Sequence, residues 1–525
     1  MNSDWLASRV QASPQKRALL IGDRQWRYAE LDQMVNGMCH RLVAAGVQPG
    51  QMVGALLPNG RIYITLIHAL VRMGAVLVPL NTRLTSTELT WQIEHVNCKL
   101  ILTSPETADQ LSTVNCQQST VNEDWLQRQD AFTLPQPSFA LENLQAVVFT
   151  SGTSGKPKAV PLTFNNHFYS AMGSAYRLGT RPSDLWLSCL PLYHVGGLAV
   201  IFRSCLYGTA VDLHPKFDLD AINNSLGSKP ITLISLVPTM LHRLLQTRDH
   251  WPATLRLILL GGAAASPDLI KQANALPRQS LIPNPQSPIS TSLTPIVATT
   301  YGLTETASQT ATLLPAEVIE KPGSVGRPLL FTQVKIVDDN GKELSAGERG
   351  EIVVSGPTVM AGYIANGELQ VASQTSTRNT EHGLRNTDYE IRNTINTGDI
   401  GYLDEDGDLW VLQRRADLIV SGGENVYPAE VEAALKGHKA VANVCVVGVP
   451  NAEWGQTVAA LVMLVEETAV TPADLIQYCR TQLAGYKIPR QIQFTKTLPQ
   501  TASGKIARSQ VAEWFHSEKN HYNHP

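Results

Sequence analysis

The chain has 525 residues, of which 43% are hydrophobic and 17% are charged, and its formal net charge at pH 7 is −3. This composition is ordinary for a globular protein, and the small net charge gives no electrostatic reason to expect nucleic acid or an anionic membrane as a partner. A chain of this length is too long for one hydrophobic core, so roughly three or four domain-sized units are expected.

The cysteines and the apolar segments indicate in which cellular compartment the protein is expected. The seven cysteines are scattered and form no C-x-x-C pair, which predicts neither a zinc site nor a disulfide framework and favours a reducing cytoplasm. The opening MNSDWLASRV lacks the basic and apolar regions of a secretory signal. The most apolar stretch, GAVLVPLN, is far shorter than the roughly 20 residues that span a bilayer, so no stable membrane insertion is expected.

Through about residue 270, apolar runs of strand length alternate with helix-like segments. QMVGALLPNG, RIYITLIHALVRMG and AVLVPLN (51–81) predict strand, helix and strand, and ITLISLVP and LRLILLGGAA flank the helical TMLHRLLQT (231–264). Continuous apolar strands separated by helices indicate parallel sheets that are covered on both faces. The fold class predicted for this part is therefore α/β with doubly wound, mostly parallel sheets.

The pattern changes near residue 326. From 326 to 414, short alternating strands are joined by Asn-Gly and Asp-Gly turns, as in TQVKIVDDNGKEL and GYLDEDGDLWVLQRR, which predicts a small β-barrel or an antiparallel sheet. After residue 415, helical and strand patterns make a compact α+β unit. The predicted division is a large N-terminal domain over 1–414 and a small C-terminal domain over 415–525.

Two polar segments interrupt these patterns. The stretch near 278–296 is rich in Pro and Ser, and the stretch near 373–394 has almost no core-forming residues. Both are expected to be surface loops or disordered, and the sequence assigns them no role.

The segment TSGTSGKPKAVPLT (150–163) combines Gly, Ser, Thr and Lys in a manner typical of a phosphate-binding loop. A Walker A loop requires G-x-x-x-x-G-K-[ST], but Thr150 replaces its first Gly and Pro157 its final hydroxyl, which disfavours a P-loop NTPase. Glycines let the backbone approach an anion closely, and hydroxyls and amides can donate to phosphate oxygens. The candidate phosphate-binding residues are Thr150, Ser151, Gly152, Thr153, Ser154, Gly155 and Lys156.

Four further motifs accompany this loop: LPLYHVGG (190–197), TTYGLTETA (299–307), NTGDIGYLDEDGDLWVLQRRADLIVSGGENVYPAEVE (396–432) and LPQTASGKIAR (498–508). Together the five motifs resemble the adenylate-forming superfamily of acyl-CoA synthetases, peptide-synthetase adenylation domains and luciferases, over nearly the whole chain. The resemblance implies an AMP-forming acid–thiol ligase that uses ATP, Mg²⁺ and coenzyme A. Such an enzyme joins a carboxylate to AMP, with release of diphosphate, and a thiol then attacks the mixed anhydride.

The resemblance assigns roles within YGLTET. Tyr301 and Gly302 are counted as nucleotide-binding residues, with Tyr301 against adenine, whereas Thr304 is expected on phosphate and Glu305 on Mg²⁺. One carboxylate with phosphates and waters is a usual ligand set for Mg²⁺. A helix N-terminus capped by Thr304 fits the same residues.

Two further groups are expected at the nucleotide. Gly261, Gly262 and Ala263 end an apolar strand, a position where open α/β sheets bind ligands, and by resemblance they flank adenine. Asp399 and Arg414 are expected to bind the ribose hydroxyls, because a carboxylate can accept from both and a guanidinium supplies donors.

The C-terminal part is expected to move during the reaction. By resemblance, Lys505 bridges the acyl carboxylate and the α-phosphate during adenylation, and the small domain then rotates to bring SGGENVYP to the site. Gly422 and Gly423 in this motif are counted as cofactor-binding residues. Relatives commonly have Asp or Lys at the hinge, where this chain has Ala416.

His194 and Arg203 are the candidate substrate-binding residues. His194 follows a strand that ends in Pro, so it is expected to face a cleft, and by resemblance it lies beside the acyl group; a core histidine is the alternative. Arg203 interrupts the apolar helical run VGGLAVIFRSCLYG, where a buried guanidinium needs an anionic partner, although a side chain reaching the surface is an alternative. The surrounding sequence is most similar to the o-succinylbenzoate–CoA ligase branch of menaquinone and phylloquinone synthesis. That substrate has two carboxylates, so one can be activated while Arg203 binds the other.

Three alternatives stay open at this point: a CoA ligase for another aryl or medium-chain acid, an adenylation enzyme that loads a carrier protein, and an inactive ATP-binding protein. The expected partners are small molecules, namely the acid, ATP and CoA, and no nucleic acid. A homo-oligomer is compatible with the sequence.

Overall fold

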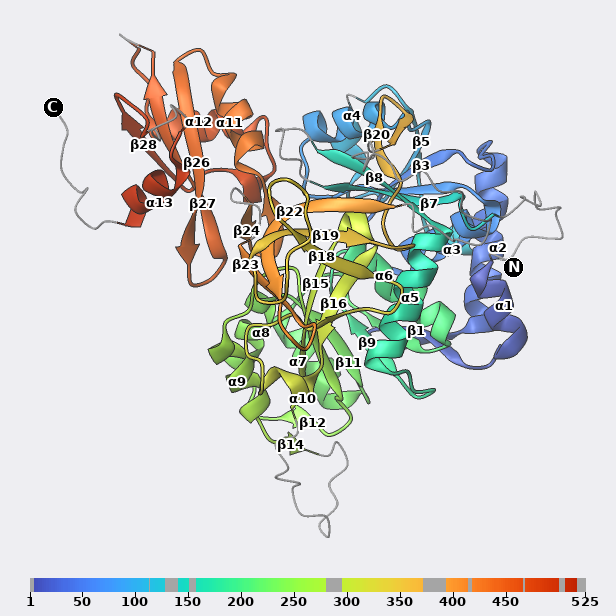
Figure 1. Cartoon of the computed structure of the whole chain (residues 1–525). Helices are drawn as coiled ribbons and strands as arrows, with labels where there is room; N and C mark the ends of the chain where they lie inside the picture. The colour runs from blue at the N-terminus through green and yellow to red at the C-terminus, as the bar shows by residue number, and fades with distance from the viewer. Residues whose placement is uncertain are drawn as a thin grey trace, which may run out of the picture.

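The computed structural model describes residues 4–112, 114–127, 140–150, 157–279, 295–371, 393–413, 418–465, 468–499 and 506–516. Two large sheets form the body of the molecule, and a smaller unit with its own sheet lies beside them (Figure 1). The two polar segments predicted as loops lie almost wholly outside the described residues.

The first large sheet has nine strands. Their order is β17 (Arg327–Pro328), β16 (Ser308–Leu313), β15 (Val297–Leu303), β13 (Leu257–Leu260), β11 (Leu233–Leu236), β9 (Leu185–Ser188), β10 (Ala210–Leu213), β1 (Arg17–Ile21) and β2 (Arg24–Arg27). From β15 to β1 the neighbouring strands are parallel. Strands β9, β10, β11 and β13 are buried throughout, as expected for parallel strands that are covered on both faces.

The second large sheet has eight strands. Their order is β21 (Glu368–Val371), β20 (Gly362–Ala365), β8 (Lys158–Thr163), β7 (Leu144–Thr150), β4 (Val76–Pro79), β3 (Met52–Leu56), β5 (Leu100–Thr103) and β6 (Gln117–Thr120). From β7 to β6 the strands are parallel, whereas β7 and β8 form an antiparallel pair.

The helices of this part are α1 (Trp5–Ala12), α2 (Tyr28–Ala44), α3 (Arg61–Met73), α4 (Ser86–His95), α5 (Phe164–Leu178), α6 (Val195–Tyr207), α7 (Leu219–Ser228), α8 (Pro238–Leu245), α9 (Pro267–Ala275) and α10 (Pro315–Val318). Short 3₁₀ turns are η1 (Ala108–Leu111), η2 (Glu123–Leu126) and η3 (Thr304–Thr306), and β12 (Trp251–Pro252) pairs with β14 (Arg278–Gln279).

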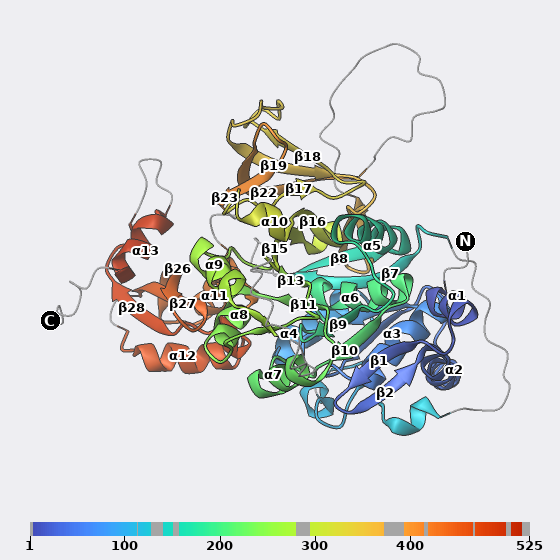
Figure 2. The ribbon, with the colours of Figure 1, turned by 90° about the horizontal axis from the view of Figure 1, so that it is seen from below.

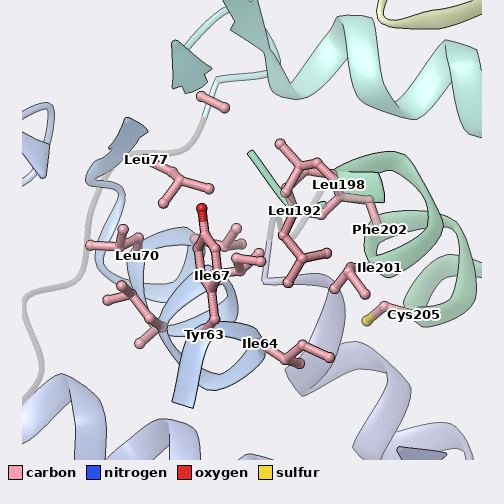
Figure 3. Packing of buried hydrophobic residues seen from close by; sticks show 14 of the residues in the cluster. Tyr63, Ile64, Ile67, Leu70, Leu77, Leu192, Leu198, Ile201, Phe202 and Cys205 are labelled. Carbon is pink, nitrogen blue, oxygen red and sulfur yellow. The ribbon is translucent and has the colours of Figure 1, made fainter. Parts of the chain in front are cut away.

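The largest hydrophobic cluster combines residues of both large sheets with residues of α2, α3, α5 and α6. Helix α3 is buried from Tyr63 to Met73, as expected of a helix that is apolar on nearly all sides. Figure 3 shows side chains of α3, among them Tyr63 and Ile64, in one cluster with Leu192 and with Ile201 of α6. Helices α7, α8 and α9 pack in a second cluster with the first sheet, and α4 in a third with the second sheet. The layers place helices on both faces of each sheet (Figure 2).

Two smaller sheets complete the molecule. Strands β18 (Gln333–Val337), β19 (Gly350–Ser355), β22 (Thr394–Leu403) and β23 (Leu409–Gln413) form an antiparallel sheet. The small C-terminal unit contains β24 (Ile419–Ser421), β25 (Glu424–Val426), β26 (Val441–Asn451), β27 (Gly455–Leu464), β28 (Gln491–Thr495), α11 (Pro428–Lys436), α12 (Pro472–Arg480), η4 (Gly485–Lys487) and α13 (Arg508–His516).

The predicted fold class is confirmed: a large α/β part with mostly parallel sheets is followed by a smaller α+β part. A small β-barrel or an antiparallel sheet is predicted for 326–414. Strands β18, β19, β22 and β23 form an open antiparallel sheet and not a closed barrel. The expected domain boundary at 414 and 415 lies outside the described residues and stays a prediction. None of the described helices combines the length and the hydropathy that a membrane crossing requires.

A buried arginine ties the N-terminal helices together. Arg72 of α3 lies 2.6 Å from Asp4 and 2.6 Å from Asp32, and it donates to the side-chain oxygen of Asn36 at 2.6 Å. Burial alone would lower the pKa of Arg72, but the two carboxylates raise it above the ordinary value. Because Asp4 also caps α1, one guanidinium holds α1, α2 and α3 in register.

We expect Arg72→Met to destabilise the large domain by about 3–5 kcal/mol, because it leaves two carboxylates without their cation. Denaturant unfolding followed by circular dichroism measures this. The control is Arg181→Met, since the Arg181 side chain is exposed, and its effect should stay within about 0.5 kcal/mol. Equal unfolding midpoints for the two variants would contradict the assigned role.

Candidate active site

The ends of the parallel strands bring the predicted motifs to one edge of the first sheet. Strand β13 leads into Gly261 and Gly262, β15 leads into Thr304, and β9 leads into the segment that ends at His194. Because parallel neighbours end at the same edge, residues far apart in the sequence meet there. The cavity at this edge is lined by residues of both the large and the small unit, among them Thr150, His194, Thr304 and Glu424.

The candidate phosphate loop joins antiparallel strands. Thr150 ends β7 and pairs with Lys158 at the start of β8. A Walker A loop instead opens a helix, so the structure agrees with the exclusion made from the sequence. Residues Ser151, Gly152, Thr153, Ser154, Gly155 and Lys156 lie outside the described part, and their binding of phosphate stays a prediction.

The η3 turn carries Thr304 and Glu305. The carboxylate of Glu305 is buried and accepts a hydrogen bond from the Tyr363 hydroxyl at 3.0 Å. Directly after the turn, Ala307 and Ser308 have positive φ values of 53° and 101°. Such backbone in non-glycine residues is strained and persists only where the surroundings impose it. The surroundings of η3 therefore hold its backbone in one fixed conformation.

Gly302 is required by the same turn. A Cβ atom on Gly302 would lie 1.7 Å from the carbonyl oxygen of Ser308, so no other residue fits without a backbone shift. The tight approach fixes how the strand leads into Thr304.

Tyr301 and Asp399 contact each other directly. The Tyr301 hydroxyl donates to Asp399 Oδ2 at 2.7 Å, and both residues are buried. The Tyr301 ring packs in the core of the four-stranded sheet and offers no exposed face to an adenine in this arrangement. Its expected contact with adenine, and that of Asp399 with ribose, therefore stay predictions.

His194 faces the cavity, as predicted. It is the N-cap residue of α6, and its side chain is 40% exposed, so it is not a core histidine. Asn59 holds the preceding segment: its amide donates to the Leu190 carbonyl at 3.0 Å, and its oxygen accepts from the Leu192 N–H at 2.9 Å. This support fixes the direction from which His194 enters the cavity.

Glu424 of the small unit meets His194 across the cavity. The His194 Nε2 atom lies 2.9 Å from Glu424 Oε2, and Arg83 Nη1 lies 2.9 Å from Glu424 Oε1. Burial alone would raise the pKa of Glu424, but His194 and Arg83 lower it to about 2. The carboxylate is thus held ionised between two residues of the large unit.

Gly422 and Gly423 lie in the hairpin of β24 and β25 and have positive φ values of 60° and 86°. A Cβ on Gly423 would lie 3.2 Å from a methyl of Val237, and a Cβ on Gly262 would lie 3.1 Å from another methyl of Val237. The hairpin of the small unit therefore sits against the strand end that carries Gly261, Gly262 and Ala263.

Arg203 is 2% exposed, which rules out a side chain that reaches the surface. Its Nη2 donates to Ser170 Oγ at 3.1 Å, and Ser170 Oγ donates to the carbonyl of Ala307 at 2.6 Å, next to the η3 turn. Its Nε has no hydrogen-bond partner, and no carboxylate of the described residues pairs with it. Burying a guanidinium without an anionic partner is costly, so the state of Arg203 calls for an explanation.

Several predicted residues lie outside the described part. These are Arg414, Ala416 and Lys505, and the roles expected for them stay predictions.

The residues that sequence reasoning missed are Glu424, Arg83 and Tyr363. Glu424 follows the glycine pair directly and begins β25, and a single carboxylate next to a hairpin turn is a weak signal. Arg83 and Tyr363 carry no signal, because their partners are contributed by distant segments.

Comparison with known proteins gives two family matches. The model of the AMP-binding enzyme family matches residues 6–364, and that of the AMP-binding enzyme C-terminal domain matches residues 430–505. The curated 2-succinylbenzoate–CoA ligase of Bacillus cereus (strain Q1) is 39% identical over 513 residues, which cover 97% of this chain and 98% of that protein. The resemblance inferred from the five motifs is confirmed.

Two solved structures of one enzyme are informative together. A double mutant of o-succinylbenzoate CoA synthetase from Bacillus subtilis, bound with its product analogue OSB-NCoA, has 34% identity, 98% coverage of both chains and a TM-score of 0.84. The complex of that enzyme with the acyl-adenylate OSB-AMP has 35% identity, coverage of 97% and 98%, and a TM-score of 0.68. The enzyme in the two structures is the same apart from two substitutions. The difference between the two TM-scores therefore reflects how the parts of that enzyme are arranged in each structure. The arrangement described here is similar to that of the product-analogue complex.

We expect Glu424→Gln to lower the apparent unfolding temperature at pH 7 by about 2–4 °C, because the substitution removes the negative charge that contacts Arg83 and His194. A carboxylate whose pKa is lowered stabilises the folded state above its unfolded pKa, and this contribution is lost as the pH falls toward about 2. The difference from the unsubstituted protein should therefore shrink at pH 3.5. Calorimetry at both pH values measures it, with the exposed Glu453→Gln as control; a difference independent of pH would contradict the assignment.

Proposed function

Because the chain belongs to the AMP-binding enzyme family, we propose that it is an ATP-dependent o-succinylbenzoate–CoA ligase that acts through an acyl-adenylate. The overall reaction joins o-succinylbenzoate to coenzyme A and converts ATP to AMP and diphosphate. Its place in menaquinone or phylloquinone synthesis follows from this product. The full-length similarity to 2-succinylbenzoate–CoA ligases supports the choice of acid.

The observation that carries the substrate assignment is the buried, unneutralised guanidinium of Arg203. o-Succinylbenzoate has two carboxylates, one of which is activated while the other stays ionised. A second carboxylate would give Arg203 the anion that its surroundings lack, whereas an uncharged acyl chain would leave the guanidinium unpaired. The link through Ser170 to Ala307 connects this subsite to the η3 turn.

The chemistry of the first step suits the residues gathered at the strand ends. A free carboxylate is a poor electrophile because attack on it must expel oxide, whereas a carboxylate joined to AMP has a good leaving group. Thr150 and Thr304 can donate to phosphate oxygens, and the segment 151–156 is proposed to supply further donors. Lys505 is proposed to bridge the acyl carboxylate and the α-phosphate.

Glu305 fits a magnesium ligand. Its carboxylate is buried and accepts a hydrogen bond from the Tyr363 hydroxyl, and no lysine or arginine of the described residues forms an ion pair with it. Mg²⁺ prefers oxygen ligands and is usually held by one or two carboxylates together with substrate phosphates. The ion would neutralise charge on the phosphates when bound.

The second step belongs to the arrangement described here. The small unit presents Gly422 and Gly423 against Val237, and glycines let a backbone approach a bound chain closely. The similarity to the product-analogue complex supports this assignment. The seven free cysteines fit a reducing compartment, so we place the enzyme in the cytoplasm.

The proposal is tested by two coupled measurements. Purified protein should release diphosphate from ATP only when o-succinylbenzoate is present, and subsequent addition of CoA should yield the thioester, identified by mass spectrometry. Diphosphate release with another acid, but not with o-succinylbenzoate, would overturn the substrate. Adenylate formation without transfer to CoA would point to a carrier protein as acceptor, and absence of diphosphate release with every acid would indicate an inactive protein.

For Arg203→Ala we expect the KM for o-succinylbenzoate to rise about 10- to 100-fold, because a hydrogen-bonded ion pair is lost. The matched substrate is 4-oxo-4-phenylbutanoate, which keeps the chain carboxylate and lacks the ring carboxylate. Its KM should be nearly the same for both proteins. Equal effects on the two acids would show that Arg203 acts on the fold and not on the second carboxylate.

A further inference from the structure

We propose that Glu88 is a positioning residue for thioester formation, holding the small unit in the present arrangement through Lys487. This inference rests on the proposed function, since it assigns a residue to the second half of that reaction. Lys487 is one of the residues that line the cavity, and its contact with Glu88 joins α4 of the large unit to the η4 turn of the small unit.

Lys487 lies between two carboxylates that belong to different units. Its Nζ is 2.7 Å from Glu88 Oε1 and 2.7 Å from Glu430 Oε1, and the Lys487 side chain is only 4% exposed. Burial alone would lower the pKa of Lys487, but Glu430 and Glu88 raise it. Lys487 therefore stays charged although it is buried, and both carboxylates stabilise its charge.

Only one of the two carboxylates depends on the arrangement of the units. Glu430 is in the first turn of α11 and belongs to the same unit as Lys487, so this pair persists wherever the small unit moves. Glu88 belongs to α4 and meets Lys487 only while the units are docked as described here. The cross-unit bond to Glu88 is what docking adds.

Residues of the large unit orient the Glu88 carboxylate. Its Oε2 accepts from the Thr85 N–H and from the Thr85 hydroxyl, both at 2.8 Å, and Glu88 occupies the third position of α4 in a capping box. The Oε1 atom is left to face Lys487. A carboxylate fixed in this way loses little side-chain entropy on pairing, so more of the attraction remains to stabilise docking.

The surroundings of Lys487 form a docking turn, defined as residues 482–487. Ala484 belongs to a hydrophobic cluster that is otherwise made of large-unit residues, and Tyr486 packs against the same cluster. Arg83 lies 4.7 Å from the centre of the Tyr486 ring, and Thr85 Oγ1 lies 3.4 Å from the Gln482 carbonyl oxygen. The apolar contacts are non-directional, whereas the bond from Glu88 fixes the register of the docking turn.

The decisive measurement separates the two half-reactions in Glu88→Gln. Glutamine keeps the capping box of α4 and has nearly the same shape, but it lacks the charge that pairs with Lys487. When preformed o-succinylbenzoyl-adenylate is mixed with CoA, we expect thioester formation to slow at least about tenfold. Diphosphate release driven by o-succinylbenzoate should stay within about twofold, because adenylation does not use this arrangement.

Glu94→Gln is the matched control, since Glu94 is an exposed residue of the same helix and its substitution should leave both half-reactions unchanged. A double-mutant cycle with Lys487→Met tests the pair itself. If Glu88 acts through Lys487, the double variant forms thioester no more slowly than Lys487→Met alone, because the same interaction is removed twice.

The outcomes distinguish this inference from the proposed function. An unsubstituted protein that releases no diphosphate with o-succinylbenzoate rejects the function. For that case, small-angle X-ray scattering without substrate still tests docking, because scattering from Glu88→Gln should depart from that of the unsubstituted protein. Identical scattering, an unchanged thioester rate, or an equal fall in both half-reactions would overturn the role of Glu88.

Discussion

The site depends on one geometric constraint, which is that neighbouring parallel strands end at the same edge of their sheet. Strands β9, β13 and β15 each end in a motif that carries a candidate ligand, and their parallel register brings these motifs to one edge, where His194 and Thr304 line the same cavity. The same edge receives the β7–β8 hairpin and the glycine hairpin of the small unit. Without the parallel core, residues separated by more than one hundred positions would have no reason to meet.

Much of this arrangement could be predicted from the sequence. The run of apolar strands fixed the sheet type, and the failure of two Walker A positions correctly excluded a strand-to-helix phosphate loop. The burial of Arg203 could not be decided from its position in an apolar helix, since a long side chain can reach the surface from such a place. Its 2% exposure settles the point because both α5 and α6 enclose it.

The contacts between the units could not be predicted, for a physical reason. His194 and Glu424 are 230 positions apart, and Glu88 and Lys487 are 399 apart, so neither pair leaves a local pattern. Each carboxylate is also explained locally, as a hairpin residue or as part of a capping box. For Tyr301 the family motif predicts a contact with adenine, which stays a prediction, and the structure adds a buried hydrogen bond to Asp399 that the motif does not reveal. Local sequence patterns predict local structure and family membership. Contacts between the two units depend on how the units dock, which no local pattern encodes.

The kind of contact found between the units suits a reaction with two steps. A large apolar interface would favour one arrangement throughout, since separation would expose its surface to water. Ionic contacts behave differently, because charges that separate regain hydration, which offsets much of the attraction that they lose. The contacts of Glu424 and Glu88 therefore fix one docked position of the small unit, while the free-energy cost of separating the two units stays small. An enzyme that must use one cavity first for a nucleotide and then for a thiol needs both properties at this interface.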